Sequence, residues 1–130
     1  MNMKTIDEKI HEAYRDSNNY LELVQMLIAA GIQTYTVDVA TDIKLYRLAD
    51  HSMVLHSEQK APRAIAETID VAQVKACIKA SQSKEMSYAQ FMPAIAAAGV
   101  RFYEAVLVGK QKQVNYIGNG GNHVEPIPLD

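Results

Sequence analysis

The 130-residue sequence lacks several features that would narrow its function. Its one cysteine, Cys77, excludes an internal disulfide and is typical of a reducing compartment. No apolar run is long enough to span a bilayer, and no arginine or lysine cluster forms a basic stripe. The N-terminal segment has neither the apolar centre nor the small-residue cleavage site of a signal peptide. We therefore expect a cytoplasmic protein that binds neither membranes nor nucleic acids.

What is present is an ordinary globular composition, with 48% hydrophobic residues and a net charge of −2. The length suits one domain over residues 1–130. Two stretches, 19–35 and 87–103, resemble each other at a spacing of 68 residues. Both begin at a polar residue that suits a helix N-cap and both contain Ala-Ala-Gly followed by an apolar residue and, four positions after the glycine, a tyrosine. The pattern predicts a helix followed by a strand, occurring twice.

The helix starts carry a capping-box pattern. Asn19 and Ser87 are each followed three residues later by Glu22 and Gln90, whose side chains are expected to reach back to the N–H of the cap. Pro93 lies inside the second of these predicted helices and removes one backbone hydrogen bond. We expect a kink there, or a helix that settles only after the proline.

Around these stretches the periodicity predicts a further helix before each copy and a meander of three strands after it. The fold class is therefore α+β, with two pseudo-repeated αα-βββ halves that form an antiparallel sheet with helices packed on it. The halves cover about residues 1–57 and 70–128 and are joined by a loop at 58–69. The last strand is expected at 123–127, after a flexible glycine-rich turn at 118–122.

The C-terminal 50 residues carry a distinctive series of motifs, which are Ile78–Gln82, Ala97–Val100, Asn115–Gly118 and His123–Glu125. In these the chain resembles a family of small bacterial and prophage-associated proteins of unknown function, often labelled "phage envelope protein". The resemblance implies an α+β domain and no particular reaction.

A candidate site lies near the C-terminus. His123 and Glu125 are two positions apart on a predicted strand, so both point to one face, and Tyr116 lies on the strand expected to pair with it. This group would bind a cation, a polar ligand or a substrate proton. The alternative, which we favour, is an edge strand on which His123 and Glu125 form a salt bridge. A single histidine and a single glutamate fall short of a metal site, so we expect no metal and no cofactor.

Asp38 is a carboxylate in an otherwise apolar strand, and we include it in the candidate ligand site. A structural ion pair is the favoured interpretation, with Lys44, Tyr46 and Arg47 on the returning strand as the expected partners. The tyrosines that recur with the repeat, Tyr20, Tyr35, Tyr88 and Tyr103, favour packing between helices and sheet over ligand stacking.

Three weaker candidates have ordinary structural interpretations that we favour. The glycines at 118–121 are better suited to a turn than to a phosphate site, because a strand rather than a helix follows them. His51 and His56 are expected to be solvated turn residues rather than ligands of a shared metal. Cys77 has no neighbouring base in the sequence and is expected to be a half-buried small residue.

Two functional hypotheses remain. The first is a non-enzymatic interaction or adaptor protein of phage or bacterial origin, acting as a homodimer or with another protein through a sheet edge or an apolar patch. The second is a small-ligand-binding protein or an unassigned enzyme, with its site near His123, Glu125, Tyr116 and Asp38. The sequence favours the first and names no ligand.

Overall fold

The computed structural model describes residues 5–57, 60–83 and 85–128. Within these ranges the chain forms two successive αα-βββ halves. The first half contains α1 (Ile6–Asp16), α2 (Tyr20–Ala29), β1 (Ile32–Asp38), β2 (Lys44–Leu48) and β3 (Met53–His56). The second contains α3 (Val71–Gln82), α4 (Tyr88–Ala97), β4 (Val100–Val106), β5 (Gln113–Gly118) and β6 (Gly121–Pro126). The predicted α+β class and the twofold occurrence of the helix-helix-strand pattern are thus confirmed.

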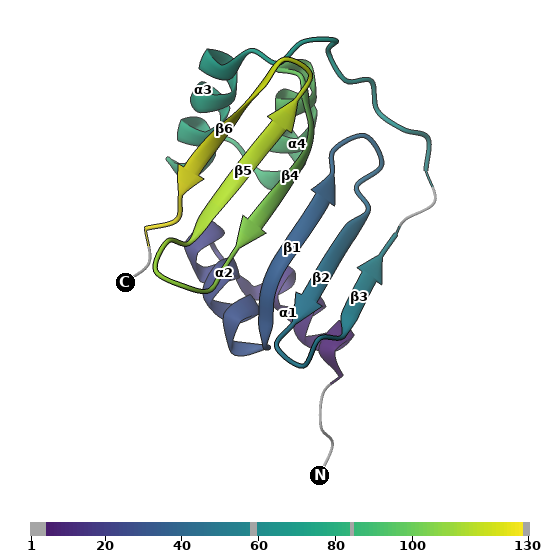
Figure 1. The fold of residues 1–130 in the computed structure, drawn as a ribbon, viewed down its shortest axis with the longest axis vertical. Helices are drawn as coiled ribbons and strands as arrows, with labels where there is room; N and C mark the ends of the chain where they lie inside the picture. Colours follow the sequence, from purple (N-terminus) through teal and green to yellow (C-terminus); the bar gives the residue numbers. More distant parts are fainter. Residues whose placement is uncertain (1–4, 58–59, 84, 129–130) are drawn as a thin grey trace.

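The strands form one antiparallel sheet in the order β3-β2-β1-β4-β5-β6 (Figure 1). The two halves meet at its centre, where β1 pairs with β4. Thr36 lies directly opposite Glu104. These two residues are 68 positions apart in the sequence, which is also the spacing between the two similar stretches. On either side of this pair the register is reciprocal, because Tyr35 faces Ala105 and Val37 faces Tyr103. The backbone pairing is therefore symmetric about Thr36 and Glu104.

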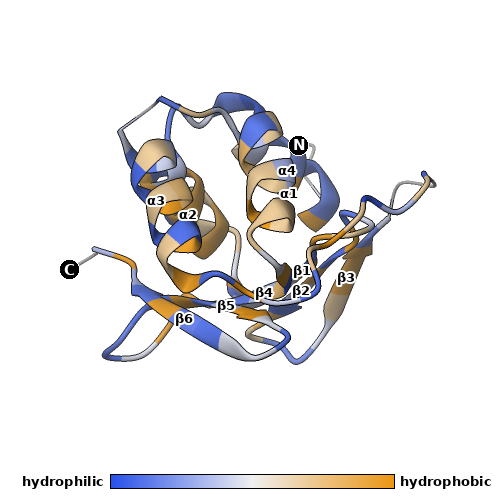
Figure 2. Cartoon of the chain, turned by 90° about the horizontal axis from the view of Figure 1, so that it is seen from above, coloured by the Kyte–Doolittle hydropathy of each residue, from blue (hydrophilic) through white to orange (hydrophobic). Residues whose placement is uncertain are grey.

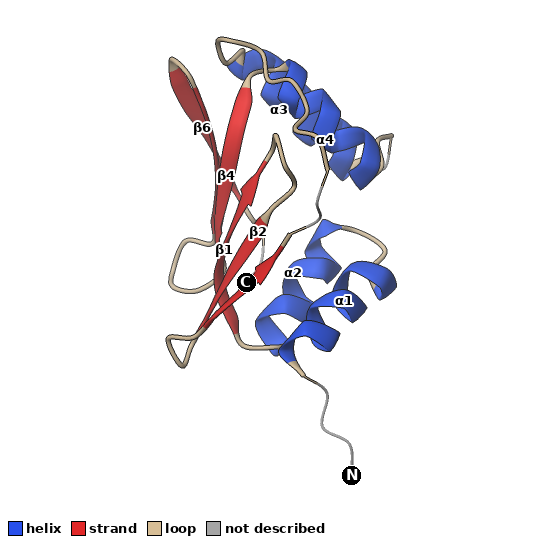
Figure 3. Cartoon of the chain, turned by 90° about the vertical axis from the view of Figure 1, so that its right-hand side faces the viewer, coloured by secondary structure: helices blue, strands red, loops and turns tan. Residues whose placement is uncertain are grey.

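All four helices lie on one face of the sheet (Figure 3). They form two pairs, α1 with α2 and α3 with α4, which follow one another along the strand direction. Alternate residues of β1, such as Tyr35 and Val37, are buried under the helices, whereas Thr36 and Asp38 face the opposite side. Figure 2 shows this arrangement from above, with both helix pairs over the same side of the sheet. The apolar core lies between the helices and the sheet and draws on both halves.

The helix caps predicted at Asn19 and Ser87 are present, and the other two helices of the described residues are capped in the same way. The side chains of Thr5, Asn19, Asp70 and Ser87 each accept a hydrogen bond from the backbone N–H three residues later. The reciprocal bond of a full capping box is formed at Ser87, whose N–H donates to Gln90 Oε1 at 2.9 Å. At Asn19 the expected return bond is replaced, because Glu22 accepts from the Asn19 side-chain amide at 3.1 Å instead.

Pro93 does not delay the start of its helix, contrary to one of our two expectations. α4 runs without interruption from Tyr88 to Ala97 and contains the proline in its interior. Pro93 lies on the exposed side, while Phe91, Met92 and Ile95 are buried against the rest of the core. Tertiary packing of this apolar face therefore maintains a helix that its sequence weakens.

The segment that joins the halves has no regular structure over residues 60–69, as predicted, and residues 58 and 59 of the predicted loop lie outside the described ranges. Its end is nevertheless tied to the second half. Asp70 N–H donates to Ala98 O at 2.8 Å, and Ile69 N–H donates to Asn119 O at 3.0 Å. The close approach depends on glycine, since a Cβ on Gly99 would come within 2.3 Å of the Thr68 carbonyl oxygen.

The C-terminal hairpin is tighter and longer than predicted. Gly118 pairs with Gly121 across a turn of Asn119 and Gly120, and Gly120 adopts the left-handed conformation with φ +93°. β6 therefore begins at Gly121 rather than at His123. Among the described residues, no helix has the length and apolar character needed to cross a bilayer.

Candidate functional site

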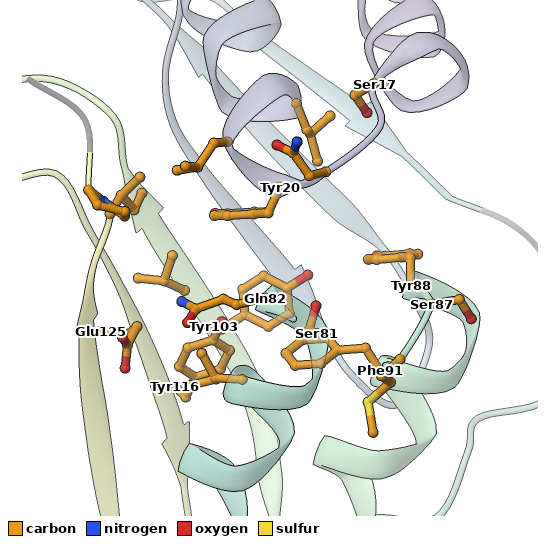
Figure 4. Close-up of a pocket in the computed structure, with 18 of the residues that line it drawn as sticks. Ser17, Tyr20, Ser81, Gln82, Ser87, Tyr88, Phe91, Tyr103, Tyr116 and Glu125 are labelled. Carbon is orange, nitrogen blue, oxygen red and sulfur yellow. The ribbon is translucent and has the colours of Figure 1, made fainter. Parts of the chain in front are cut away.

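A cavity of about 870 Å³ lies between the two helix pairs, above the centre of the sheet (Figure 4). Its rim contains exposed residues from the connection between α1 and α2 and from the connection between α3 and α4 with the end of α3. These are Asn18 and Asn19 on one side and Gln82, Glu85 and Ser87 on the other. Its floor is formed by side chains of β1, β4, β5 and β6. The cavity therefore exists only because the two halves present their helix pairs to one shared sheet.

Aromatic rings form a large part of the lining. All seven tyrosines of the chain lie on the helix-covered side of the sheet or on the helices that cover it, and the cavity is lined by Tyr14, Tyr20, Tyr35, Tyr88, Tyr103 and Tyr116, together with Phe91. The seventh, Tyr46, lies next to the lining, since its hydroxyl donates to that of Tyr14 at 3.0 Å. The sequence led us to favour packing for four of these tyrosines, but the structure places those four in the cavity lining.

The tyrosines of the sheet repeat from one half to the other. In the first half Tyr35 on β1 is paired with Tyr46 on β2, with ring centroids 5.8 Å apart. In the second half Tyr103 on β4 is paired with Tyr116 on β5, with centroids 5.3 Å apart. The two ladders meet where the Tyr35 and Tyr103 rings approach edge to face at 6.5 Å. The four rings form a row that crosses the sheet, in which Tyr35, Tyr103 and Tyr116 line the floor of the cavity and Tyr46 lies beside it.

The phenol groups of the strand tyrosines and of Tyr20 on α2 are neutral at ordinary pH. Burial raises the pKa of Tyr20 to about 12, and its hydroxyl shares a hydrogen bond of 2.7 Å with that of Tyr35. Burial likewise raises the pKa of Tyr35, Tyr103 and Tyr116 well above the ordinary value. The site therefore offers hydroxyl groups as hydrogen-bond donors and acceptors, not as phenolate bases.

The ammonium group of Lys44 contacts two of the aromatic rings that line the cavity. The Lys44 Nζ lies 4.3 Å from the centroid of the Tyr14 ring and 4.9 Å from that of Tyr88. Both distances are within the range of a cation–π interaction. Lys44 comes from β2, Tyr14 from α1 and Tyr88 from α4, so this contact joins the sheet to both helix pairs.

The structure brings together three of the four residues predicted for the site. His123 on β6 is paired with Tyr116 on β5, and His123 Nε2 lies 2.9 Å from Glu125 Oε1. Both β6 side chains are partly buried on the helix-covered side, and Glu125 lines the cavity beside Tyr116 (Figure 4). The favoured interpretation, an edge-strand pair of His123 and Glu125, matches this geometry. The same geometry also places Glu125 at the edge of the cavity.

Asp38, the fourth predicted residue, does not lie with this group. It lies on the uncovered face of the sheet, because its neighbours Val37 and Val39 are the residues buried under the helices. Its carboxylate forms an ion pair with Arg101 and accepts from Thr41 N–H at 3.0 Å. The expected structural ion pair exists, but its partner comes from β4 of the other half rather than from β2.

The weaker candidates are accounted for structurally. Gly118 and Gly121 are paired strand residues, so they do not form an open phosphate loop. His51 is an exposed turn residue, as expected, whereas His56 is only partly exposed and is not a turn residue. His56 lies in β3, where its Nε2 is 2.7 Å from Asp7 Oδ1 and its ring stacks on His11 with centroids 5.0 Å apart.

Cys77 is buried in α3, and burial raises the pKa of its thiol, which suits a packing residue rather than a nucleophile. The described part of the chain contains no group of three or more histidine, cysteine, aspartate or glutamate side chains arranged to hold a metal ion.

Comparison with known proteins places the chain in a family without assigning it an activity. Residues 8–124 match the model of a family described as a protein of unknown function, DUF1398, and the chain belongs to this family. No curated protein in the comparison matches the chain. The predicted association with prophages is not part of the family description and stays a prediction.

Proposed function

We propose that this member of the DUF1398 family binds a small organic molecule in the cavity between its two helix pairs. The observation that supports the proposal is the cavity itself. At about 870 Å³ it falls within the 300 to about 1,000 Å³ typical of ligand sites, and its lining combines aromatic rings with polar side chains, several of them at the exposed rim. This is the second of the two hypotheses drawn from the sequence, with the site moved inward from the β6 strand.

The lining favours a ligand that is partly apolar. Tyr103, Tyr116 and Phe91 present ring surface, while Val114 and Ile127 add aliphatic surface on the same side. Burying such a ligand releases water from apolar surface, and the neutral tyrosine hydroxyls orient it through hydrogen bonds.

Binding is favoured over catalysis at this site. The residues that line the cavity within the described ranges include no histidine and no cysteine, and the phenols hold their protons. The lining also contains serines and the carboxylates Glu85 and Glu125, but no hydrogen bond within the described ranges joins a lining serine to either carboxylate. The bonded nucleophile and base usual for covalent catalysis are therefore not assembled there.

A cavity-filling variant tests the proposal. Ser81 lies on α3 and lines the cavity, so Ser81→Phe places a ring in the space, whereas Ala76→Phe adds the same ring on the exposed side of the same helix. We would screen a library of small metabolites by thermal shift against the wild-type protein and both variants. Compounds that stabilise the wild type and Ala76→Phe but not Ser81→Phe support the proposal. Stabilisation that survives in Ser81→Phe would place the ligand elsewhere and contradict it.

A specific observation also supports the interaction hypothesis, which we retain as a second proposal. Met53 and Leu55 are 64% and 62% exposed on β3, an edge strand whose outer side is not paired with another described strand. Exposed apolar residues on an open sheet edge are features of strand-mediated association. We propose a homodimer, or a complex with another protein, through this edge.

Sedimentation measurements over a range of protein concentrations test the second proposal. If β3 mediates self-association, replacing both Met53 and Leu55 with lysine gives a monomer, while Val108→Lys, at another exposed apolar position, leaves the assembly intact. A wild-type chain that stays monomeric at high concentration would exclude the homodimer.

A further inference from the structure

The row of tyrosine rings on the sheet has a different charge beside each of its two ends, although the tyrosines of the two halves occupy corresponding positions. In the first half the strand position next to the Tyr35–Tyr46 ladder holds Lys44, paired with His56. In the second half the matching position next to the Tyr103–Tyr116 ladder holds Val114, paired with Glu125. The first half therefore supplies its own cation to the rings, and the second half supplies a carboxylate instead.

The charge of the lining is consistent with this difference. The ionisable side chains among the described lining residues, tyrosines aside, are Glu85 and Glu125, and none of these lining residues is lysine, arginine or histidine. Glu125 Oε1 is paired with His123, whereas Oε2 has no hydrogen bond to any of the described residues. Neutral phenol rings present electron-rich faces, and Lys44 shows that those of Tyr14 and Tyr88 already hold an ammonium group.

We infer that the cavity takes a small organic cation, an ammonium or amidinium group on an aromatic or aliphatic body, with its charge beside Glu125. The body of the ligand packs against the rings of Tyr103 and Tyr116. Figure 4 shows Tyr88 and Glu125 on opposite sides of the cavity. The Lys44 ammonium group lies against the Tyr88 ring and would repel a second cation there, so the charge of the ligand lies at the Glu125 side. This inference rests on the proposed function and gives it a ligand class.

Three planar probes of nearly equal size separate charge from shape: benzamidine, which is a cation at pH 7, benzamide, which is neutral, and benzoate, which is an anion. Their affinities would be measured by ¹H–¹⁵N NMR titration of the full chain. We expect benzamidine to shift resonances of cavity residues and to bind about tenfold more tightly than benzamide, with benzoate weakest.

Two variants locate the charge. Glu125→Gln keeps the shape of the side chain and is expected to lower the affinity for benzamidine to that for benzamide. Glu104→Gln removes the same charge from an exposed residue outside the lining, and is expected to leave the affinity unchanged. Should Glu125→Gln fail to fold, the order of the three probes on the wild-type protein still decides the question.

The outcomes distinguish this inference from the proposed function. Equal or tighter binding of benzamide or benzoate in the cavity overturns the cation inference and leaves the cavity as a ligand site. Failure of all three probes to bind also overturns it, while the proposed function is decided separately by the comparison of Ser81→Phe with Ala76→Phe.

Discussion

Gly31 and Gly99 end the second helix of each half with nearly the same backbone conformation, φ +94° and +91°, but in different surroundings. A Cβ on Gly31 would meet no atom within 4 Å, whereas one on Gly99 would lie 2.3 Å from the Thr68 carbonyl oxygen. The two glycines were predicted from the same local pattern. Only Gly99 also makes room for the segment that joins the halves.

This difference predicts unequal costs for one substitution. Gly31→Ala places a Cβ in the left-handed region and is expected to lower the free energy of unfolding by about 1–2 kcal/mol. Gly99→Ala carries the same cost and forces Thr68 and Ile69 to shift, which adds about 1–3 kcal/mol. Urea unfolding followed by circular dichroism would measure both. Equal losses would show that the approach of residues 68–69 to Gly99 does not contribute to stability.

The hydroxyl pair of Tyr20 and Tyr35 gives the second prediction. The two oxygens are 2.7 Å apart and largely buried, so removing either leaves the other without its partner. In a double-mutant cycle with Tyr20→Phe and Tyr35→Phe, we expect a coupling energy of about 1 kcal/mol. The matched control is Tyr103→Phe, at the repeat position of Tyr35.

Among the described residues, the Tyr103 hydroxyl has one hydrogen bond, to the Met92 sulfur at 3.9 Å. Sulfur is a weak acceptor, so removal of this hydroxyl is expected to cost less than removal of the Tyr35 hydroxyl. Additive losses for Tyr20→Phe and Tyr35→Phe, with no coupling, would contradict the assigned hydrogen bond.

These two cases show how far the sequence alone predicts the structure. Helix caps, terminal glycines and strand alternation are local signals, and they predicted the order of the elements. The pairing of β1 with β4 joins residues about 68 positions apart, and no local pattern specifies it. For that reason the sequence points to β2 for the partner of Asp38, whereas the partner is Arg101 on β4 of the other half.

The cavity was beyond sequence analysis for the same reason. It is bounded by two helix pairs whose separation is set by the symmetric register around Thr36 and Glu104. The repeated tyrosines were the sequence feature that pointed to the cavity. However, a tyrosine that packs in the core and one that lines a cavity show the same spacing in the sequence. Glu125 is predictable because strand alternation puts it on the same face as His123, and Tyr116 because it lies on the strand expected to pair with theirs.

The raised pKa of the buried tyrosines predicts loss of stability at alkaline pH. Burial raises the pKa of Tyr20 to about 12, above the ordinary value of about 10 in the unfolded chain. The folded chain therefore holds this proton where the unfolded chain releases it. The free energy of unfolding keeps this contribution below about pH 10 and loses it as the pH rises toward 12.

Tyr35, Tyr103 and Tyr116 act in the same direction, since burial raises the pKa of each. We would measure urea unfolding at several alkaline pH values for the wild type and for Tyr20→Phe, whose stability should decline less steeply. Lysines also titrate in this range, and the comparison removes their common effect. Tyrosinate absorbance for these residues should rise together with the loss of helical signal. Ionisation of Tyr20, Tyr35, Tyr103 and Tyr116 at the ordinary pKa in a folded chain would refute the assignment.

Pro93 and Gln25 provide the last prediction, because they lie 68 positions apart at corresponding exposed points of α4 and α2. Pro93→Ala restores a backbone donor inside a helix and removes the clash of the proline ring with the preceding turn, and we expect it to stabilise the protein by about 2 kcal/mol. The reverse change, Gln25→Pro, is expected to destabilise it by about 3 kcal/mol. Both side chains point to solvent, so neither change removes a core contact.

Thermal and urea unfolding would measure the two effects, with Gln25→Ala as the control for loss of the side chain. A Pro93→Ala variant no more stable than the wild type would mean that the α4 backbone is already strained or bent to accommodate the proline.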